Sequence, residues 1–163
     1  MQTITERFSK IGSVPTLERA DIVAQTTAAY QYLKARTSKL IHFELEVPDK
    51  PIYVELNNQL YGWTIENLVK NAIDAMKGKG TISLSIQHKN DKVFIDVSDT
   101  GKGIPKRDHK RVFSPGFTTK KRGWGLGLSL VKRIIEEYHK GKIRVSKSSP
   151  KGTTMSMMLR EIT

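Results

Sequence analysis

The chain contains a long glycine-rich segment without helical or strand periodicity, and this segment limits the folds that the sequence can adopt. Residues 99–125 hold five of the chain's twelve glycines together with many lysines and arginines. A strand pattern ends directly before the segment, at Ser98, and a helical pattern begins directly after it, at Leu126. Irregular segments of this length are uncommon in compact domains and usually carry function. We therefore expect residues 99–125, called the lid segment below, to form a functional loop of an α/β domain.

Hydrophobic periodicity outside the lid segment predicts the rest of the fold. Helical spacing occurs at Thr16–Arg36, Glu55–Met76 and Leu126–His139, with Gly141 as the expected cap of the last helix. Strand patterns occupy residues 40–47, 52–54, 81–87, 92–98, 142–147 and 153–160. We expect an α/β two-layer sandwich, with a mixed, mostly antiparallel sheet of about five strands and about three helices on one face.

The first residues differ from the rest of the chain. Residues 1–10 are polar, and Ile11-Gly-Ser-Val-Pro15 has the composition of a turn-forming linker. We expect residues 1–15 to be the stub of a preceding helix and a linker, and residues 16–163 to be one domain.

Composition and charge exclude several classes of protein. The absence of cysteine excludes disulfides and thiolate metal sites. No run of about 18 apolar residues appears, and the first residues lack the apolar segment of a signal peptide, so we expect a soluble protein of the cytoplasm. The net charge of +12 would attract polyanions. The sequence has no aromatic-and-basic RNA-binding signature and no convincing helix-turn-helix pattern, so we expect no nucleic-acid partner.

The motif Asp99-Thr-Gly-Lys-Gly-Ile104 stands where the strand pattern of residues 92–98 ends. An ionised carboxylate only accepts hydrogen bonds, so Asp99 can take the exocyclic amine of adenine and would repel the carbonyl of guanine. Gly101 and Gly103 can adopt positive φ and let the backbone approach a ring closely. Taken alone, the motif could also be an ordinary Asp-Thr-Gly turn.

The stretch Gly123-Trp-Gly-Leu-Gly127-Leu leads directly into the last predicted helix. Unpaired N–H groups and the positive end of the helix dipole make such a start suitable for an anion. No strand precedes the stretch, so it is not a dinucleotide-binding fingerprint, and the chain contains no Walker A sequence. A flexible loop entering a helix is the plain alternative, and it is compatible with anion binding.

Five motifs in a fixed order resemble the N, G1, F, G2 and G3 boxes with which sensor histidine kinases bind ATP. They are Glu66-Asn-Leu-Val-Lys-Asn71-Ala-Ile-Asp-Ala75, residues 99–104, Phe113-Ser-Pro-Gly-Phe117-Thr-Thr-Lys120, residues 123–128 and Gly152-Thr-Thr154. The resemblance covers about residues 61–159 and implies the Bergerat-type fold that gyrase, a heat-shock chaperone family and MutL share. The sequences of residues 117–128 and 7–13 are most similar to those of nitrogen-regulation-type (NtrY-like) sensor kinases.

The resemblance implies ATP and Mg²⁺ as ligands and gives each matching residue a role. Asn71 would hold Mg²⁺ through its side-chain oxygen, which suits an ion that takes oxygen ligands and keeps part of its water shell. Lys120 or Arg122 would neutralise charge on the γ-phosphoryl group, although a solvated basic loop is the alternative for their neighbours. The other contacts with the nucleotide would come from Asp99, Gly101, Gly103, Ile104, Phe117, Thr118, Gly123, Gly125, Leu126, Gly127, Leu128 and Thr153.

Within this resemblance, the residue type at Asn67 distinguishes phosphoryl transfer from hydrolysis. In the related ATPases the position four residues before the metal asparagine is a glutamate that activates water. Here that position is Asn67, which cannot take a proton, and Glu66 is turned by about 100° around the helix. This favours transfer to another group over hydrolysis, and Asn67 is grouped with Lys120 and Arg122 as a catalytic residue.

None of the four histidines fits the residue that a sensor kinase phosphorylates on a helix. His42, His88, His109 and His139 are followed by phenylalanine or lysine rather than by an acidic residue. We expect the chain to be the catalytic domain alone, monomeric, with the acceptor histidine on a dimeric helical domain of the same protein. The next acceptor would be the receiver domain of a response regulator, and the parent could be an inner-membrane sensor kinase with this portion in the cytoplasm.

Two other functions stay open. A free-standing serine kinase of the anti-sigma type shares the fold and the motifs and needs no helical domain. A non-catalytic, nucleotide-gated binding module would use the basic lid segment to hold an acidic partner. Transfer of phosphate to a supplied histidine domain separates a kinase from such a module.

Overall fold

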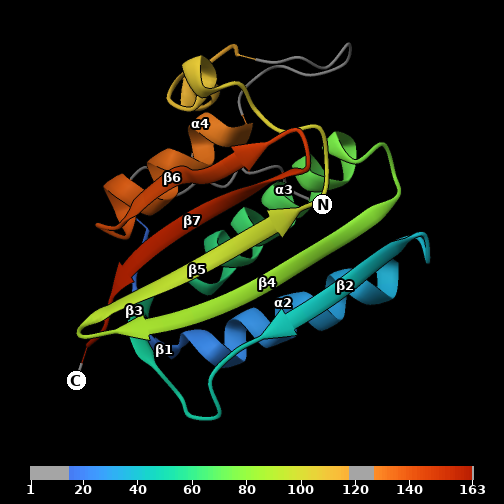
Figure 1. Ribbon diagram of the computed structural model, residues 1–163. Coiled ribbons are helices and arrows are strands. Elements are labelled where there is room, and N and C mark those ends of the chain that lie inside the picture. The colour runs from blue at the N-terminus through green and yellow to red at the C-terminus, as the bar shows by residue number, and fades with distance from the viewer. Residues whose placement is uncertain (1–14, 118–126, 163) are drawn as a thin grey trace.

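A five-stranded sheet in the order β2-β4-β5-β7-β6 forms one layer of the protein, and helices cover one of its faces (Figure 1). The computed structural model describes residues 15–117 and 127–162. The strands are β2 (Ile41–Glu46), β4 (Gly80–Lys89), β5 (Lys92–Asp99), β6 (Lys142–Ser149) and β7 (Gly152–Arg160). β2 runs parallel to β4, and the other neighbours in this sheet are antiparallel. The predicted fold class is confirmed.

The helical layer consists of α2 (Ile22–Arg36), α3 (Asn58–Ala75) and α4 (Gly127–Lys132), which continues as the π-helix η3 (Arg133–Tyr138). α2 and α3 begin at side-chain caps. The Asp21 carboxylate accepts a hydrogen bond from the Val23 N–H at 3.0 Å, and the Asn57 side chain accepts one from the Leu60 N–H at 3.0 Å. Such caps satisfy N–H groups that a helix start leaves unpaired.

The helix predicted over residues 16–36 is wrong at its start. Glu18–Asp21 form the strand β1, which pairs antiparallel with β3 (Tyr53–Leu56) in a separate two-stranded sheet. Asp21 ends this strand, and its carboxylate also accepts a hydrogen bond from the Ile52 N–H at 3.1 Å. The helix therefore begins only at Ile22, because the preceding residues are paired with a distant strand.

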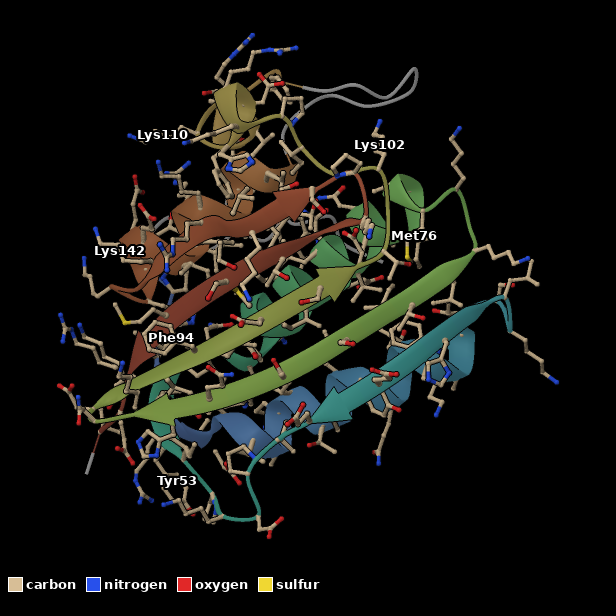
Figure 2. The ribbon with its side chains drawn as sticks, in the orientation of Figure 1. Tyr53, Met76, Phe94, Lys102, Lys110 and Lys142 are labelled. Carbon is tan, nitrogen blue, oxygen red and sulfur yellow. The ribbon has the colours of Figure 1, made fainter. Side chains whose placement is uncertain are left out.

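The core lies between the sheet and α3. Ile82 and Leu84 on β4 and Val93 and Ile95 on β5 are fully buried, as is Ile65 on α3. Alternation along the strands sends the intervening side chains to the opposite face, which none of the described helices covers. Figure 2 shows Phe94 on that face. Truncating a core residue such as Leu84 to alanine costs about 2–5 kcal/mol.

The last helix is confirmed from Gly127 onward, but its second half is a π-helix. The His139 N–H donates to the Ile134 carbonyl at 3.0 Å, the five-residue step of a π-turn. Gly141 takes part in the cap of this helix, because its N–H donates to the Ile135 carbonyl at 2.8 Å, while Lys140 adopts the positive φ of 57°. Gly141 is also needed for space, since a Cβ there would lie 2.2 Å from the Met158 carbonyl oxygen.

The described part of the lid segment contains two short 3₁₀ turns, η1 (Lys106–Asp108) and η2 (Arg111–Phe113), which lie above β6 and α4 in Figure 1. Phe113 is buried in the core and Phe117 packs against it, so this part is anchored to the domain. Within residues 15–117 and 127–162, no helix is long and apolar enough to cross a membrane.

Candidate active site

Asp99 is the last residue of β5, and two backbone donors hold its carboxylate. Oδ1 accepts a hydrogen bond from the Gly101 N–H at 2.8 Å and another from the Thr153 N–H at 3.2 Å. The first bond closes the turn after the strand, and the second crosses to β7. Burial raises the pKa of the Asp99 carboxyl above its ordinary value, and the two N–H donors oppose this rise. Asp99 is therefore a fixed hydrogen-bond acceptor.

A pocket of about 350 Å³ opens beside Asp99. The β6–β7 hairpin lines the rest of it, with Ser148 and Thr153 next to the carboxylate and with Lys147 and Lys151 contributing positive charge. The volume is at the lower end of the range for small-molecule sites. An acceptor beside hydroxyl and ammonium groups suits an anionic ligand that carries an amine.

Glycines allow three segments to meet at this pocket. Gly103 adopts a φ of 84°, and a Cβ there would lie 2.1 Å from the Ser149 carbonyl oxygen. A Cβ on Gly152 would lie 2.0 Å from the Asp99 carbonyl oxygen, and one on Gly101 would lie 2.7 Å from the Ala75 carbonyl. The turn after β5, the β6–β7 hairpin and the end of α3 could not approach so closely with larger residues at these positions.

The turn after β5 is also bonded to the end of α3. The Lys102 N–H donates to the Ala75 carbonyl at 3.2 Å, and the Thr100 hydroxyl donates to the Met76 sulfur at 3.3 Å. Figure 2 shows Met76 and Lys102 at this end of β5. The position of Asp99 is thus coupled to α3.

The same helix reaches α4 through Asn67. A Cβ on Gly127, the first residue of α4, would lie 3.0 Å from both the nitrogen and the oxygen of the Asn67 side chain. Asn71 is one helical turn further along this face and Ala75 one turn beyond it. The separation of eight residues between Asn67 and Ala75 corresponds to about 12 Å of helix. One face of α3 therefore connects the start of α4 to the turn that carries Asp99, with Asn71 between them.

Glu66 lies on another side of α3. Its carboxylate pairs with Lys70 at 3.3 Å, and both residues line a groove that also includes Leu33 and Arg36 of α2. The carboxylate therefore faces α2 rather than the Asn67 and Asn71 face. In the part of the chain that the structure describes, no group of three or more histidines and carboxylates could hold a metal ion.

Comparison with known proteins identifies the family. Residues 59–162, more than half of the chain, match the family described as "Histidine kinase-, DNA gyrase B-, and HSP90-like ATPase". The chain belongs to this family.

Its curated relatives within the family include sensor kinases. Sensor histidine kinase ZraS of Salmonella typhimurium is 44% identical over 94 residues, which are 57% of this chain and 20% of that protein. Alginate biosynthesis sensor protein KinB of Pseudomonas aeruginosa is 33% identical over 146 residues, 88% of this chain and 24% of that protein. The chain thus spans about a fifth to a quarter of the length of these relatives.

Solved structures of the family share the fold. The catalytic domain of histidine kinase ThkA superposes with a TM-score of 0.81 at 29% identity, over 90% of this chain and 97% of that one. ThkA has also been solved in complex with response regulator protein TrrA, with a TM-score of 0.80 at 25% identity over 98% of this chain and 46% of that one. The finer similarity to NtrY-like kinases stays a prediction.

The structure places the residues of the family motifs as follows. Asn67 and Asn71 lie on α3, Thr153 lies on β7, and the turn after β5 carries the rest of the G1 box. Phe117 and Leu128 are partly buried against the core. The residues gathered around the pocket and the α3 face are Asn67, Asn71, Asp99, Gly101, Gly103, Ile104, Gly127 and Thr153. Six predicted site residues lie outside the described residues, and their roles stay predictions: Thr118, Lys120, Arg122, Gly123, Gly125 and Leu126.

The sequence did not single out Ser148, which the structure places inside the site. Its hydroxyl oxygen accepts a hydrogen bond from the Ile104 N–H at 2.6 Å and lies 2.9 Å from the Thr153 hydroxyl oxygen. Ser148 belongs to none of the family motifs. Its place opposite Thr153 depends on an irregular register between β6 and β7, which strand periodicity does not reveal.

The four histidines are all described, and none occupies an exposed position within a helix. His42 is exposed on β2 beside Glu44, at 3.2 Å, and His88 contacts Glu161 at 2.7 Å. His109 bonds to the Ile104 carbonyl at 2.9 Å. His139 is buried: its Nδ1 lies 2.9 Å from the Ile134 carbonyl oxygen, and its Nε2 accepts a hydrogen bond from the Asn57 N–H at 3.1 Å. Each histidine therefore has a structural partner.

Proposed function

We propose that this chain is the catalytic, ATP-binding domain of a two-component sensor histidine kinase. In this proposal it presents the γ-phosphoryl group of ATP to a histidine on a helical domain outside this chain. The main support for the proposal is that one face of α3 runs from the turn that carries Asp99 to the start of α4. Membership of the family and the likeness to the catalytic domain of ThkA support it. Residues 16–163 are taken as this domain, and residues 1–15 as the stub of a preceding helix and a linker.

Asp99 recognises the base. Its carboxylate accepts the exocyclic amine of adenine, and guanine would place a carbonyl oxygen against it. The backbone of Gly101, Gly103 and Ile104 lies along the base, and the Thr153 hydroxyl contacts its edge directly or through a water. With the base held at Asp99, the sugar and phosphates extend along α3 toward Asn71 and α4.

Asn71 is the residue that would hold Mg²⁺. Its neutral amide oxygen would be a suitable ligand for an ion that prefers oxygen ligands and keeps part of its hydration shell. When bound, Mg²⁺ neutralises charge on the phosphates.

The reaction is a phosphoryl transfer in which this chain positions and stabilises rather than attacks. A nitrogen of the acceptor imidazole forms a bond to the γ-phosphorus, the bond to the bridging oxygen breaks, ADP leaves, and the imidazole proton passes to solvent. Asn67 occupies the place of a water-activating glutamate and cannot take a proton, so hydrolysis is slow. Lys120 and Arg122 neutralise charge on the transferred group.

The partners follow from this chemistry. The helical domain of the same protein supplies the acceptor histidine, and the receiver domain of a response regulator takes the phosphoryl group next. The ThkA complex with TrrA supports the second partner. The isolated domain is monomeric, binds no nucleic acid, and works in the cytoplasm, where ATP is supplied.

Transfer of labelled phosphate tests the proposal. The chain is incubated with ATP labelled at the γ-position and with dimeric helical domains of ZraS, KinB and ThkA, each as wild type and with its acceptor histidine removed. We expect an acid-labile, base-stable label on wild-type acceptors only. An acid-stable label on serine would favour the anti-sigma type of kinase. ATP binding without transfer to any acceptor would favour the nucleotide-gated module.

A further inference from the structure

Ser148 lies beside Thr153 in the pocket next to Asp99. We propose that Ser148 is a positioning residue that directs the hydrogen of the Thr153 hydroxyl toward the nucleotide base and thereby makes the site selective for adenine. The inference rests on the proposed ATP-binding function and adds a specificity determinant from outside the family motifs.

A β-bulge brings Ser148 to this position. Lys142 pairs with Met158 and Val145 with Met155, but beyond Ser146 the register shifts by one, so that Ser148 pairs with Thr153. Without the shift, Lys147 would stand opposite Thr153. At the irregular position, the Ser146 hydroxyl donates a hydrogen bond to the Thr154 carbonyl at 3.2 Å. Bulges next to binding sites re-aim side chains in this way.

The backbone fixes the role of the Ser148 oxygen. The Ile104 N–H can only donate, and it lies 2.6 Å from Ser148 Oγ. Gly103 allows this approach: a Cβ there would lie 3.2 Å from Ser148 Oγ as well as overlapping the Ser149 carbonyl. Ser148 Oγ is therefore an acceptor toward the turn after β5.

The hydrogen of Ser148 then has one evident acceptor. Within the described residues, Thr153 Oγ1 at 2.9 Å is the other hydrogen-bonding partner of Ser148 Oγ. A hydroxyl carries one hydrogen and can accept through two lone pairs. When Ser148 donates to Thr153, the Thr153 hydrogen is left for a ligand in the pocket. In the proposed arrangement the bonds run in one direction, from the Ile104 N–H through Ser148 to Thr153.

The resulting pair of groups matches adenine and mismatches guanine. Asp99 accepts and Thr153 donates, while adenine offers an amine beside the acceptor nitrogen N1. Guanine offers a carbonyl beside an N1–H, which reverses both groups. Sites with polar groups fixed for one partner reject the wrong partner strongly, because the unmatched groups are left unpaired. Ser148 thereby fixes Thr153 as the hydrogen-bond donor to N1 of adenine.

Calorimetric titration with ATP and with 1-deaza-ATP, which lacks the N1 acceptor, tests the inference. For the wild type we expect ATP to bind about three- to tenfold more tightly than 1-deaza-ATP. The isosteric variants Ser148→Thr and Ser148→Val differ only in the hydroxyl group. We expect Ser148→Thr to keep the wild-type ratio of affinities. Ser148→Val should lose affinity for ATP but little for 1-deaza-ATP, so its ratio falls toward about one.

Ser98→Ala is the matched control. Ser98 forms a hydroxyl pair of similar length with Thr154, at 2.8 Å, on the opposite face of the same two strands as Asp99 and Thr153. In Ser98→Ala, the ratio of the affinities for ATP and 1-deaza-ATP should equal that of the wild type. Equal loss of both nucleotides in Ser148→Val would assign Ser148 a structural role only and overturn the inference. Failure of the folded wild type to bind ATP at all would overturn the proposed function and this inference together. If Ser148→Val does not fold, Ser148→Ala replaces it with the same expectation.

Discussion

The Asp99 carboxylate and the Thr153 N–H are joined by a hydrogen bond of 3.2 Å across 54 residues of sequence. The pairing of β5 with β7 places the two residues opposite each other. A second donor, the Gly101 N–H, holds the same oxygen. The acceptor is thus oriented by the sheet itself, and in the proposed function this preorganisation lowers the entropy cost of binding the base.

Replacing Asp99 by asparagine should leave the fold intact. At neutral pH the variant should be at least as stable as the wild type. Burial raises the pKa of Asp99 in the folded protein, so the folded state binds more protons than the unfolded state between the two pKa values. Stability therefore decreases as pH rises from the ordinary aspartate pKa of about 3.9 through the raised value, and stays lower above it. Thermal unfolding of both proteins at pH 7 and pH 4 measures this. A large loss of melting temperature in Asp99→Asn at pH 7 would contradict it.

Replacing Asn71 by alanine should remove the Mg²⁺-dependent part of ATP affinity. The wild type should bind ATP about tenfold more tightly with Mg²⁺ than with a chelator, whereas Asn71→Ala should bind equally under both conditions. Glu66→Gln is the control, because Glu66 faces α2 and pairs with Lys70. Calorimetry gives all the affinities. An unchanged Mg²⁺ effect in Asn71→Ala would place the metal elsewhere.

Gly103→Ala should destabilise the protein more than Gly116→Ala. Both glycines have a φ near +85°, at 84° and 86°, so both variants carry about 1–2 kcal/mol of backbone strain. Only at Gly103 would the new Cβ overlap another atom, since nothing lies within 4 Å of the corresponding point at Gly116. We expect a further loss of about 1–3 kcal/mol for Gly103→Ala, measured by urea unfolding. Equal losses in the two variants would mean that the hairpin moves away at no cost.

His139→Gln should remove part of the acid sensitivity of the protein. Burial lowers the pKa of His139 in the folded state, where the neutral ring accepts a hydrogen bond from the Asn57 N–H. The unfolded state then binds more protons below about pH 6.5, so the stability from this residue is complete above that pH and decreases as pH falls. Urea unfolding at pH 8, 6.5 and 5.5 should show a shallower loss in His139→Gln. The exposed His42→Gln is the control, and parallel pH profiles of His139→Gln and the wild type would refute the prediction.

Periodicity predicted the elements whose burial is regular. The alternation along β4 and β5 and the buried stripe of α3 appear directly in the sequence, and their boundaries differ by only a few residues from those of the structure. β1 escaped prediction because residues 18–21 continue the spacing of the following helix, and their strand form depends on pairing with β3. The π-turn escaped for a similar reason. It accommodates two consecutive buried residues, Ile134 and Ile135, which helical spacing alone does not distinguish.

Candidate site residues could be named from the sequence where a motif ties a residue type to a fixed spacing. Asp99, Asn71 and the glycines of the turn after β5 could be named because their chemistry is tied to motifs. Ser148 could not, because its position depends on the one-residue shift between β6 and β7. The adjacent serine, Ser149, has no sequence feature that distinguishes it from Ser148.

The most direct test of the central claim is a calorimetric titration of the chain with Mg·ATP, with Mg·GTP and Asp99→Asn as controls. We predict saturable binding of ATP, no binding of GTP, and loss of ATP affinity by at least about a hundredfold in Asp99→Asn. Binding of ATP and GTP with equal affinity, or undiminished binding by Asp99→Asn, would show that Asp99 does not read the base. The absence of any heat at millimolar ATP from the folded wild type would contradict the assignment of this chain as an ATP-binding catalytic domain.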